Sequence, residues 1–141
     1  MADPITAIGL AASVVQLIDT TLQVIQYANN MKGSSADQAR FGMEASSLLT
    51  LLMSLRYDLE QSTVEDAWFV GIRSIGIKDG PLDQLKEALE SVATKLQPQS
   101  GLKKLGSKLI WPIEKQELVS VLQRIERTKT LISLAYNRDN L

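Results

Sequence analysis

The stretch of sequence that decides the fold is residues 4–31, PITAIGLAASVVQLIDTTLQVIQYANNM, in which Asp19 is the only charged residue. Asp3 precedes it and can cap the first free N–H groups of a helix, and Pro4 suits the first helical position. We therefore predict one long helix with almost no charge. A helix that is apolar around most of its circumference is expected in a protein core or in a bilayer.

Small neutral polar residues form a thin stripe along this predicted helix, because their spacing alternates between three and four. Within the stripe, Gly9 and Ser13 have a spacing that lets two helices approach closely, either in a core or in a membrane. The stripe continues toward Asn30 and consists of Thr6, Gly9, Ser13, Gln16, Thr20 and Gln23.

The length of the uncharged run decides between core and bilayer for the resting state. The longest run without a charge is residues 4–18. This run is shorter than the stretch of about 20 predominantly apolar residues that a spanning helix needs. Asp19 would also be costly in lipid. We therefore expect the helix at rest to be the central helix of a soluble bundle, with Asp19 in an ion pair with a basic residue of another helix.

The second predicted helix covers residues 36–61. Ser34 and Asp37 have capping-box spacing at its start. Apolar residues then recur every three or four positions, which predicts a core-facing stripe. The predicted stripe is Phe41, Ala45, Leu48, Leu52, Leu55 and Leu59.

Residues 62–81 are the least regular part of the sequence. Residues 64–70 can form one or two helical turns, and we expect residues 71–80 to be a loop because Gly71, Gly76 and Gly80 interrupt any pattern. The apolar residues of that loop, Ile72, Ile75 and Ile77, are expected to fold back on the bundle. An exposed loop that binds a partner is the alternative.

A third long helix follows the turn Asp79-Gly80-Pro81, where proline suits the first helical position. Its apolar residues again recur every three or four positions, and Pro98, Ser100 and Gly101 end it. The predicted core residues are Leu82, Leu85, Leu89, Val92 and Leu96.

The last helix is predicted to begin near Pro112, after a possible short helix over residues 102–109. Arg124, Arg127 and Lys129 are expected largely outside the core. The residues expected to face the core are Leu118, Val121, Leu122, Ile125, Ile132 and Ala135.

A cluster of lysines lies around this junction, namely Lys103, Lys104, Lys108 and Lys115. Near an anionic lipid leaflet each such group contributes about 1 kcal/mol of attraction. The simpler interpretation is a solvated polar surface. Nucleic-acid binding is not expected, because the net charge is −1 and the chain is not basic overall.

The composition removes most catalytic chemistry. The chain has 141 residues with neither cysteine nor histidine, so it lacks a thiol nucleophile and the commonest general base and metal ligand. No glycine-rich phosphate loop is present. We expect no enzyme activity, no cofactor, no metal site and no small-molecule substrate.

These patterns predict a single all-α domain over residues 1–141. The predicted fold is an up-down four-helix bundle with a central hydrophobic N-terminal helix and a short extra helix before the last one. No strand pattern is visible.

Two segments resemble a known family. Residues 1–17, MADPITAIGLAASVVQL, resemble the N-terminus of fungal STAND proteins, which are the NOD-like receptors of filamentous fungi. Residues 109–115, LIWPIEK, together with residues 131–135, LISLA, resemble the second hallmark of their HeLo-like N-terminal domain. The resemblance implies that the chain is the N-terminal part of a longer receptor.

The resemblance also implies a function. Such domains are similar to cell-death domains in which oligomerisation brings N-terminal helices together to permeabilise the plasma membrane. We would then expect self-association on activation, contact with membrane lipids, and a cytoplasmic location that changes to the plasma membrane. The matching membrane-acting positions are Ile5, Ile8, Leu10, Val14, Val15, Leu17 and Ile18.

The alternative function is a non-enzymatic interaction or signalling domain of a fungal NOD-like receptor. In that case the first helix would stay buried, and exposed residues such as Lys104 or Arg127 would control binding.

Overall fold

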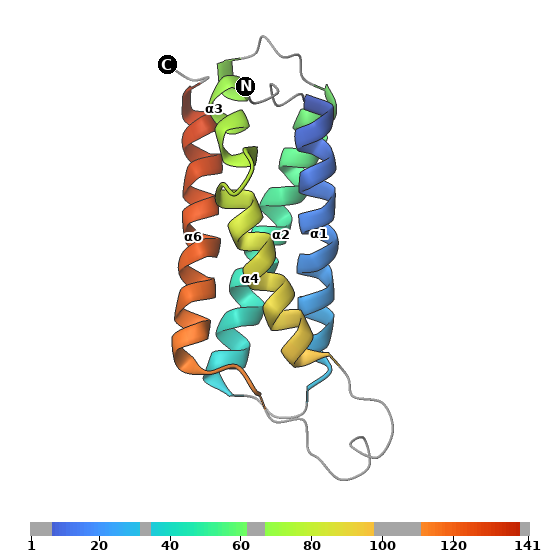
Figure 1. Cartoon of the computed structure of the whole chain (residues 1–141), viewed down its shortest axis with the longest axis vertical. Coiled ribbons are helices and arrows are strands. Elements are labelled where there is room, and N and C mark those ends of the chain that lie inside the picture. The colour runs from blue at the N-terminus through green and yellow to red at the C-terminus, as the bar shows by residue number, and fades with distance from the viewer. Residues whose placement is uncertain (1–6, 32–34, 62–66, 98–110, 139–141) are drawn as a thin grey trace.

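The computed structural model describes residues 7–31, 35–61, 67–97 and 111–138. All regular structure in these ranges is helical, and none of it is strand. The helices pack side by side as a bundle (Figure 1). The expected short helix over residues 102–109 lies outside the described residues. The helices are α1 (Ala7–Asn29), α2 (Ala36–Gln61), α3 (Ala67–Arg73), the 3-10 turn η1 (Ser74–Gly76), α4 (Pro81–Leu96) and α6 (Lys115–Arg138).

Helix α2 forms with the bounds predicted for it. At its start the Ser35 hydroxyl accepts a hydrogen bond from the N–H of Gln38 at 3.0 Å, which satisfies one of the free donors of the first turn. The Gln38 side chain donates to the carbonyl of Ala28 at 2.8 Å and so ties the end of α1 to the start of α2. The predicted core stripe is confirmed, since Phe41, Ala45, Leu48, Leu52, Leu55 and Leu59 are all buried.

The segment after α2 is more helical than the sequence suggested. Helix α3 runs through Gly71 to Arg73 and continues as η1, so the prediction of a loop from residue 71 is wrong for residues 71–76. Packing overrides the glycine signal here, because Ile72 and Ile75 are buried in the core. Ile77 does not fold back as expected and is 49% exposed.

The turn into α4 follows the predicted chemistry. Asp79 has a positive φ of 60°, and its N–H donates to the Asp83 carboxylate at 2.8 Å. The Gly80 N–H donates to the Ile77 carbonyl at 2.9 Å, and Pro81 opens the helix. The predicted core residues of α4 are confirmed as buried: Leu82, Leu85, Leu89, Val92 and Leu96.

Helix α6 begins three residues later than predicted, at Lys115 rather than at Pro112. Its first turn closes with a bond from the N–H of Leu118 to the carbonyl of Glu114 at 2.9 Å. Ile113 and Leu118 flank this start and are both buried, which is the arrangement of a hydrophobic staple. The other predicted core residues of α6 are also buried: Val121, Leu122, Ile125, Ile132 and Ala135.

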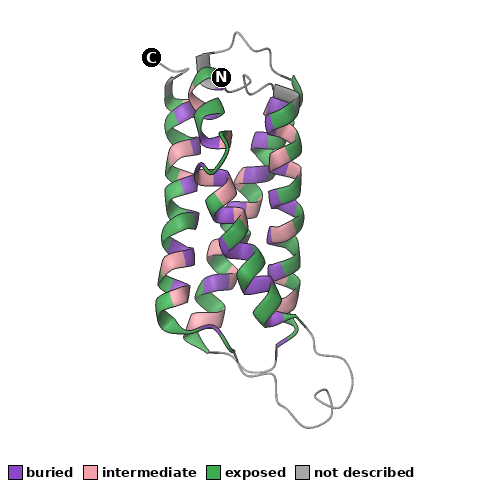
Figure 2. Cartoon of the chain, in the orientation of Figure 1, coloured by how far each residue is buried: buried purple, intermediate pink, exposed green. Residues whose placement is uncertain are grey.

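Helix α1 packs against α2 and α4 along one side. Its other side is exposed at Ala12, Asp19, Gln26 and Asn29, and the alternation of buried and exposed residues along it is visible in Figure 2. The predicted central position of this helix is therefore wrong on its outer side. The outer strip consists of alanine and amide residues together with Asp19, and such residues are tolerated in solvent.

Candidate membrane-acting helix

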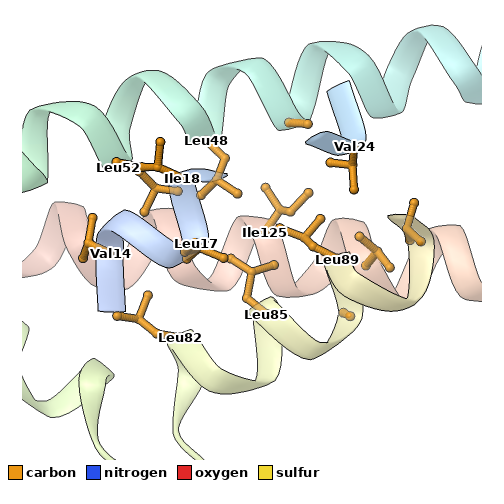
Figure 3. Close-up of a cluster of buried hydrophobic side chains, with 14 of the residues drawn as sticks. Val14, Leu17, Ile18, Val24, Leu48, Leu52, Leu82, Leu85, Leu89 and Ile125 are labelled. Atoms are coloured by element: carbon orange, nitrogen blue, oxygen red, sulfur yellow. The ribbon is translucent and has the colours of Figure 1, made fainter. Parts of the chain in front are cut away.

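The apolar side of α1 holds the residues expected to act on a membrane. Leu10, Val14, Leu17 and Ile18 are buried, with at most 4% of their surface exposed. Val15 is half-buried at the edge of this side. Ile5 and the side chain of Ile8 lie outside the described part of the chain. Figure 3 shows Val14, Leu17 and Ile18 in one cluster with Leu48 and Leu52 of α2 and Leu82 and Leu85 of α4.

Burial of these side chains sets the cost of releasing α1. Fully burying one large aliphatic side chain contributes roughly 1.5–3 kcal/mol. Together with the fully buried Val24, five such side chains correspond to roughly 8–15 kcal/mol. This range is comparable with the whole stability of a typical domain. The apolar side of α1 therefore cannot reach a membrane without a large rearrangement of the bundle.

The predicted polar stripe lies at the surface of the folded bundle. Gly9, Gln16 and Gln23 are exposed, and Ser13 and Thr20 are half-buried. Thr6 lies outside the described residues. The stripe is thus placed at the border between the buried side of α1 and solvent.

Gln16 links the stripe to α4. Its side-chain carbonyl accepts a hydrogen bond from the Lys86 ammonium at 2.9 Å. Two further bonds stay within α1: the Thr20 hydroxyl donates to the Gln16 backbone carbonyl at 3.1 Å, and the Gln23 amide donates to the Tyr27 hydroxyl at 2.9 Å. The polar groups at these positions are therefore satisfied while α1 is packed.

Asp19 does not behave as predicted. Its side chain is exposed, and it takes part in no ion pair within the ranges that the structure describes. The interhelical pair expected from the sequence is wrong because Asp19 points away from the core, where water solvates the carboxylate.

Of the four lysines considered for lipid contact, the structure describes one. Lys115 is exposed in the first turn of α6, whereas Lys103, Lys104 and Lys108 lie outside the described residues. Lys95, which is near them in sequence, forms an ion pair with Glu117 of α6. The lipid contacts remain a prediction.

Two polar contacts join α2 to α6 and could not be predicted from the sequence. The Tyr136 hydroxyl donates to the Asp58 carboxylate, and the Lys129 ammonium lies 3.6 Å from the Glu44 carboxylate. Burial raises the pKa of Tyr136 above its ordinary value, and the hydrogen bond to Asp58 and its negative charge raise it further. Because each pair joins residues far apart in the chain, only the packed structure reveals it.

Two further features are absent from the part of the chain that the structure describes. Within the described ranges, no group of acidic residues is arranged to hold a metal ion. No helix in the same ranges is long and apolar enough to cross a bilayer.

Comparison of the chain with protein-family models, with curated proteins and with solved structures finds no match.

Proposed function

We propose that this chain is an inducible cell-death execution domain of the HeLo-like kind, without enzyme activity, in which clustering releases α1 to permeabilise the plasma membrane. The proposal includes an up-down order for the four long helices, a short further helix before α6, and a cytoplasmic resting state. The observation that supports it is α1 itself. Residues 7–29 contain a single charge, and five large apolar side chains are buried in a core cluster that α1 must leave before it can meet lipid, namely Leu10, Val14, Leu17, Ile18 and Val24.

The polar stripe has a role in the proposed pore, which α1 forms after its release from the bundle. In an oligomer, Gln16, Thr20 and Gln23 would face a water-filled pore, while the opposite side of each helix would face lipid. Every backbone polar group in a bilayer must be satisfied internally, and a helix satisfies this condition. At rest, the same stripe is held against α4 by the bond between Gln16 and Lys86.

Release requires a strong input. Shifting a two-state equilibrium from about 1:99 to about 99:1 takes about 5.5 kcal/mol of preferential stabilisation. Clustering of several chains at an anionic membrane supplies such a bias, because each copy adds apolar burial and each lysine near the leaflet adds about 1 kcal/mol. A single copy in dilute solution should stay packed.

A covalent lock tests this proposal directly. The chain contains no native cysteine, so Gln16→Cys with Lys86→Cys can be joined by a short bis-maleimide, and the side chains at these positions already meet. The full chain, clustered through an inducible oligomerisation module fused after Leu141, is added to phosphatidylserine vesicles loaded with a dye. We expect dye release from the clustered unlocked chain and its loss on locking.

The controls are the two single-cysteine variants treated with the same reagent, which should release dye like the unlocked chain. Equal release from locked and unlocked chains, or no release from any clustered form, would sink the proposal.

A second function, a non-enzymatic interaction or signalling domain of a fungal NOD-like receptor, is supported by the burial of Leu10 and Val14. In that case α1 never leaves the bundle. The locked variant would then signal normally in the longer receptor, and substitutions at exposed positions such as Arg127 would change partner binding instead.

A further inference from the structure

The outer face of α2 is the surface with an unexplained composition. Residues 45–55 contain no charge, although much of this segment is open to solvent. Three large apolar side chains protrude from the outer face of α2: Met43, Met53 and Tyr57 are 73%, 56% and 64% exposed. Serines and a threonine fill the space between them, and the exposed ones are Ser46, Ser47, Thr50 and Ser54.

These residues form one face that points away from the bundle. On a helix with 3.6 residues per turn, residues seven positions apart lie nearly on one line, so Met43, Thr50 and Tyr57 share the midline of the face. The buried stripe that includes Phe41 and Leu59 lies on the opposite side of the same helix. No other described helix covers the face, because all three side chains on its midline are exposed.

Most charges beside this face already have partners in the same chain. Arg56 pairs with Glu60 at 3.1 Å, and Glu44 pairs with Lys129. Arg40 is exposed and takes part in no ion pair within the described ranges. One carboxylate oxygen of Asp58 accepts a hydrogen bond from the Tyr136 hydroxyl, and Asp58 is only partly buried.

Arg40 and Asp58 are of opposite sign and lie on the same edge of the face. Arg40 is ten residues before Thr50 and Asp58 is eight residues after it, and 100° per residue places both side chains toward α6. An antiparallel copy of α2 related by a two-fold axis at Thr50 therefore brings each arginine to the aspartate of the other copy. The face is complementary in charge to itself.

We propose that a second copy of this chain docks on the outer face of α2, antiparallel and with the two-fold axis at Thr50. Met43 then packs against Tyr57 of the partner subunit, and Arg40 meets Asp58 of the partner subunit. Tyrosine and methionine are enriched in protein interfaces and charges are depleted at interface centres, as on this face. A closed two-fold contact uses the same patch on both subunits.

A parallel pair of α2 helices would not bring Arg40 to Asp58 of the partner subunit. Arg40 and Asp58 are 18 residues apart, which is roughly 27 Å along a helix at about 1.5 Å per residue. Only the antiparallel order brings them together. The contact involves α2 and does not require release of α1, so it is independent of the function proposed above.

Single cysteines test the geometry. When the two helix axes are roughly 8–10 Å apart, the two Thr50 Cα atoms that face each other across the two-fold axis lie roughly 3.5–5.5 Å apart. This distance overlaps the Cα separation of about 4.4–6.8 Å found in disulfides. Under mild oxidation, Thr50→Cys should therefore form a disulfide with its own copy. Met43→Cys and Tyr57→Cys should each form no disulfide-linked dimer alone and should form a mixed disulfide when the two variants are combined.

Thr94→Cys is the matched control, because Thr94 is an exposed threonine on α4 with the same bond to the carbonyl four residues before it as Thr50. Cross-linking of Thr50→Cys no faster than that of Thr94→Cys would overturn the proposal. Efficient self-cross-linking of Met43→Cys and of Tyr57→Cys would overturn the antiparallel order.

Sedimentation of the cysteine-free chain gives a second, independent measurement. Thr50→Glu places two like charges on the axis, which should weaken self-association roughly a hundredfold, whereas Thr94→Glu should leave it unchanged. Circular dichroism checks that both variants are folded. A wild-type chain that stays monomeric up to millimolar concentration, or equal association of the two variants, would contradict the inference.

Discussion

Helices α1 and α2 lie side by side and show opposite relations between composition and exposure. Helix α1 has one charge in 23 residues and is the most membrane-like segment by sequence. Among its side chains that the structure describes, Leu22 is nevertheless the only large hydrophobic one that is exposed. Helix α2 has a regular stripe of buried residues, and yet it exposes Met43, Met53 and Tyr57. Apolar composition therefore does not identify the apolar surface, because packing decides which side chains meet water.

This difference in exposed apolar side chains arises from the residues on the solvent-facing sides of the two helices. Apart from Asp19 and Leu22, the exposed positions of α1 are small or carry amides, such as Ala12, Gln16 and Gln26. On α2 the core stripe, with Leu49 and Leu51 packed beside it, leaves Met43, Met53 and Tyr57 exposed to solvent. This difference motivates both proposals: a role for α1 that requires its release, and contacts of α2 that are available in the resting state.

The largest expected effect tests the burial of α1. Leu17→Ala should lower the free energy of unfolding by about 2–5 kcal/mol, because it removes a fully buried side chain and leaves a cavity. Leu22→Ala on the same helix, where the side chain is 40% exposed, should cost less than about 1 kcal/mol. Urea denaturation measures both. Similar losses for the two variants would mean that α1 is not packed on one side only.

The next effect concerns the contact between α2 and α6. Because burial and Asp58 raise the pKa of Tyr136, the folded state favours the neutral phenol. This contribution to stability is complete below the unfolded pKa of about 10 and is lost as the pH rises through the higher folded pKa. Tyr136→Phe should cost about 1–2 kcal/mol at pH 7 and make stability less sensitive to pH above about 10.

Tyr57→Phe is the control for that experiment, since Tyr57 is on α2 but 64% exposed. Its stability should match that of the unmodified chain at pH 7, and its alkaline profile should be unchanged. A Tyr136→Phe variant with an unaltered alkaline profile would show that the bond to Asp58 does not form in solution.

The smallest effect tests the backbone of α2. A Cβ added at Gly42 would meet no atom within 4 Å, and its φ is not positive. Gly42→Ala should therefore raise the free energy of unfolding by about 0.5–1 kcal/mol, because alanine loses less backbone entropy on folding. Gly80→Ala should lower it instead, since the new Cβ would lie 2.9 Å from the Ile77 carbonyl oxygen. Thermal unfolding compares the two.

Much of the candidate site could be predicted because it depends on helical periodicity. The buried side of α1 and the polar stripe at its edge follow from spacings of three and four, which fix the side of a helix on which each residue lies. The position of that stripe against α4 could not be predicted, because Gln16 and Lys86 are 70 residues apart. Asp19 was misassigned for the same reason, since periodicity does not say which side another helix covers.

The sequence by itself determined which residues form the core of α2, α4 and α6, because a repeat of three and four places those residues on one side of each helix. It also determined the turn at Asp79-Gly80-Pro81 through local backbone chemistry. Only the tertiary structure decided that α1 keeps an exposed side, that residues 71–76 stay helical, and that the face of Met43, Thr50 and Tyr57 stays uncovered. These outcomes depend on which helices become neighbours, and that choice is made by packing between segments distant in the chain.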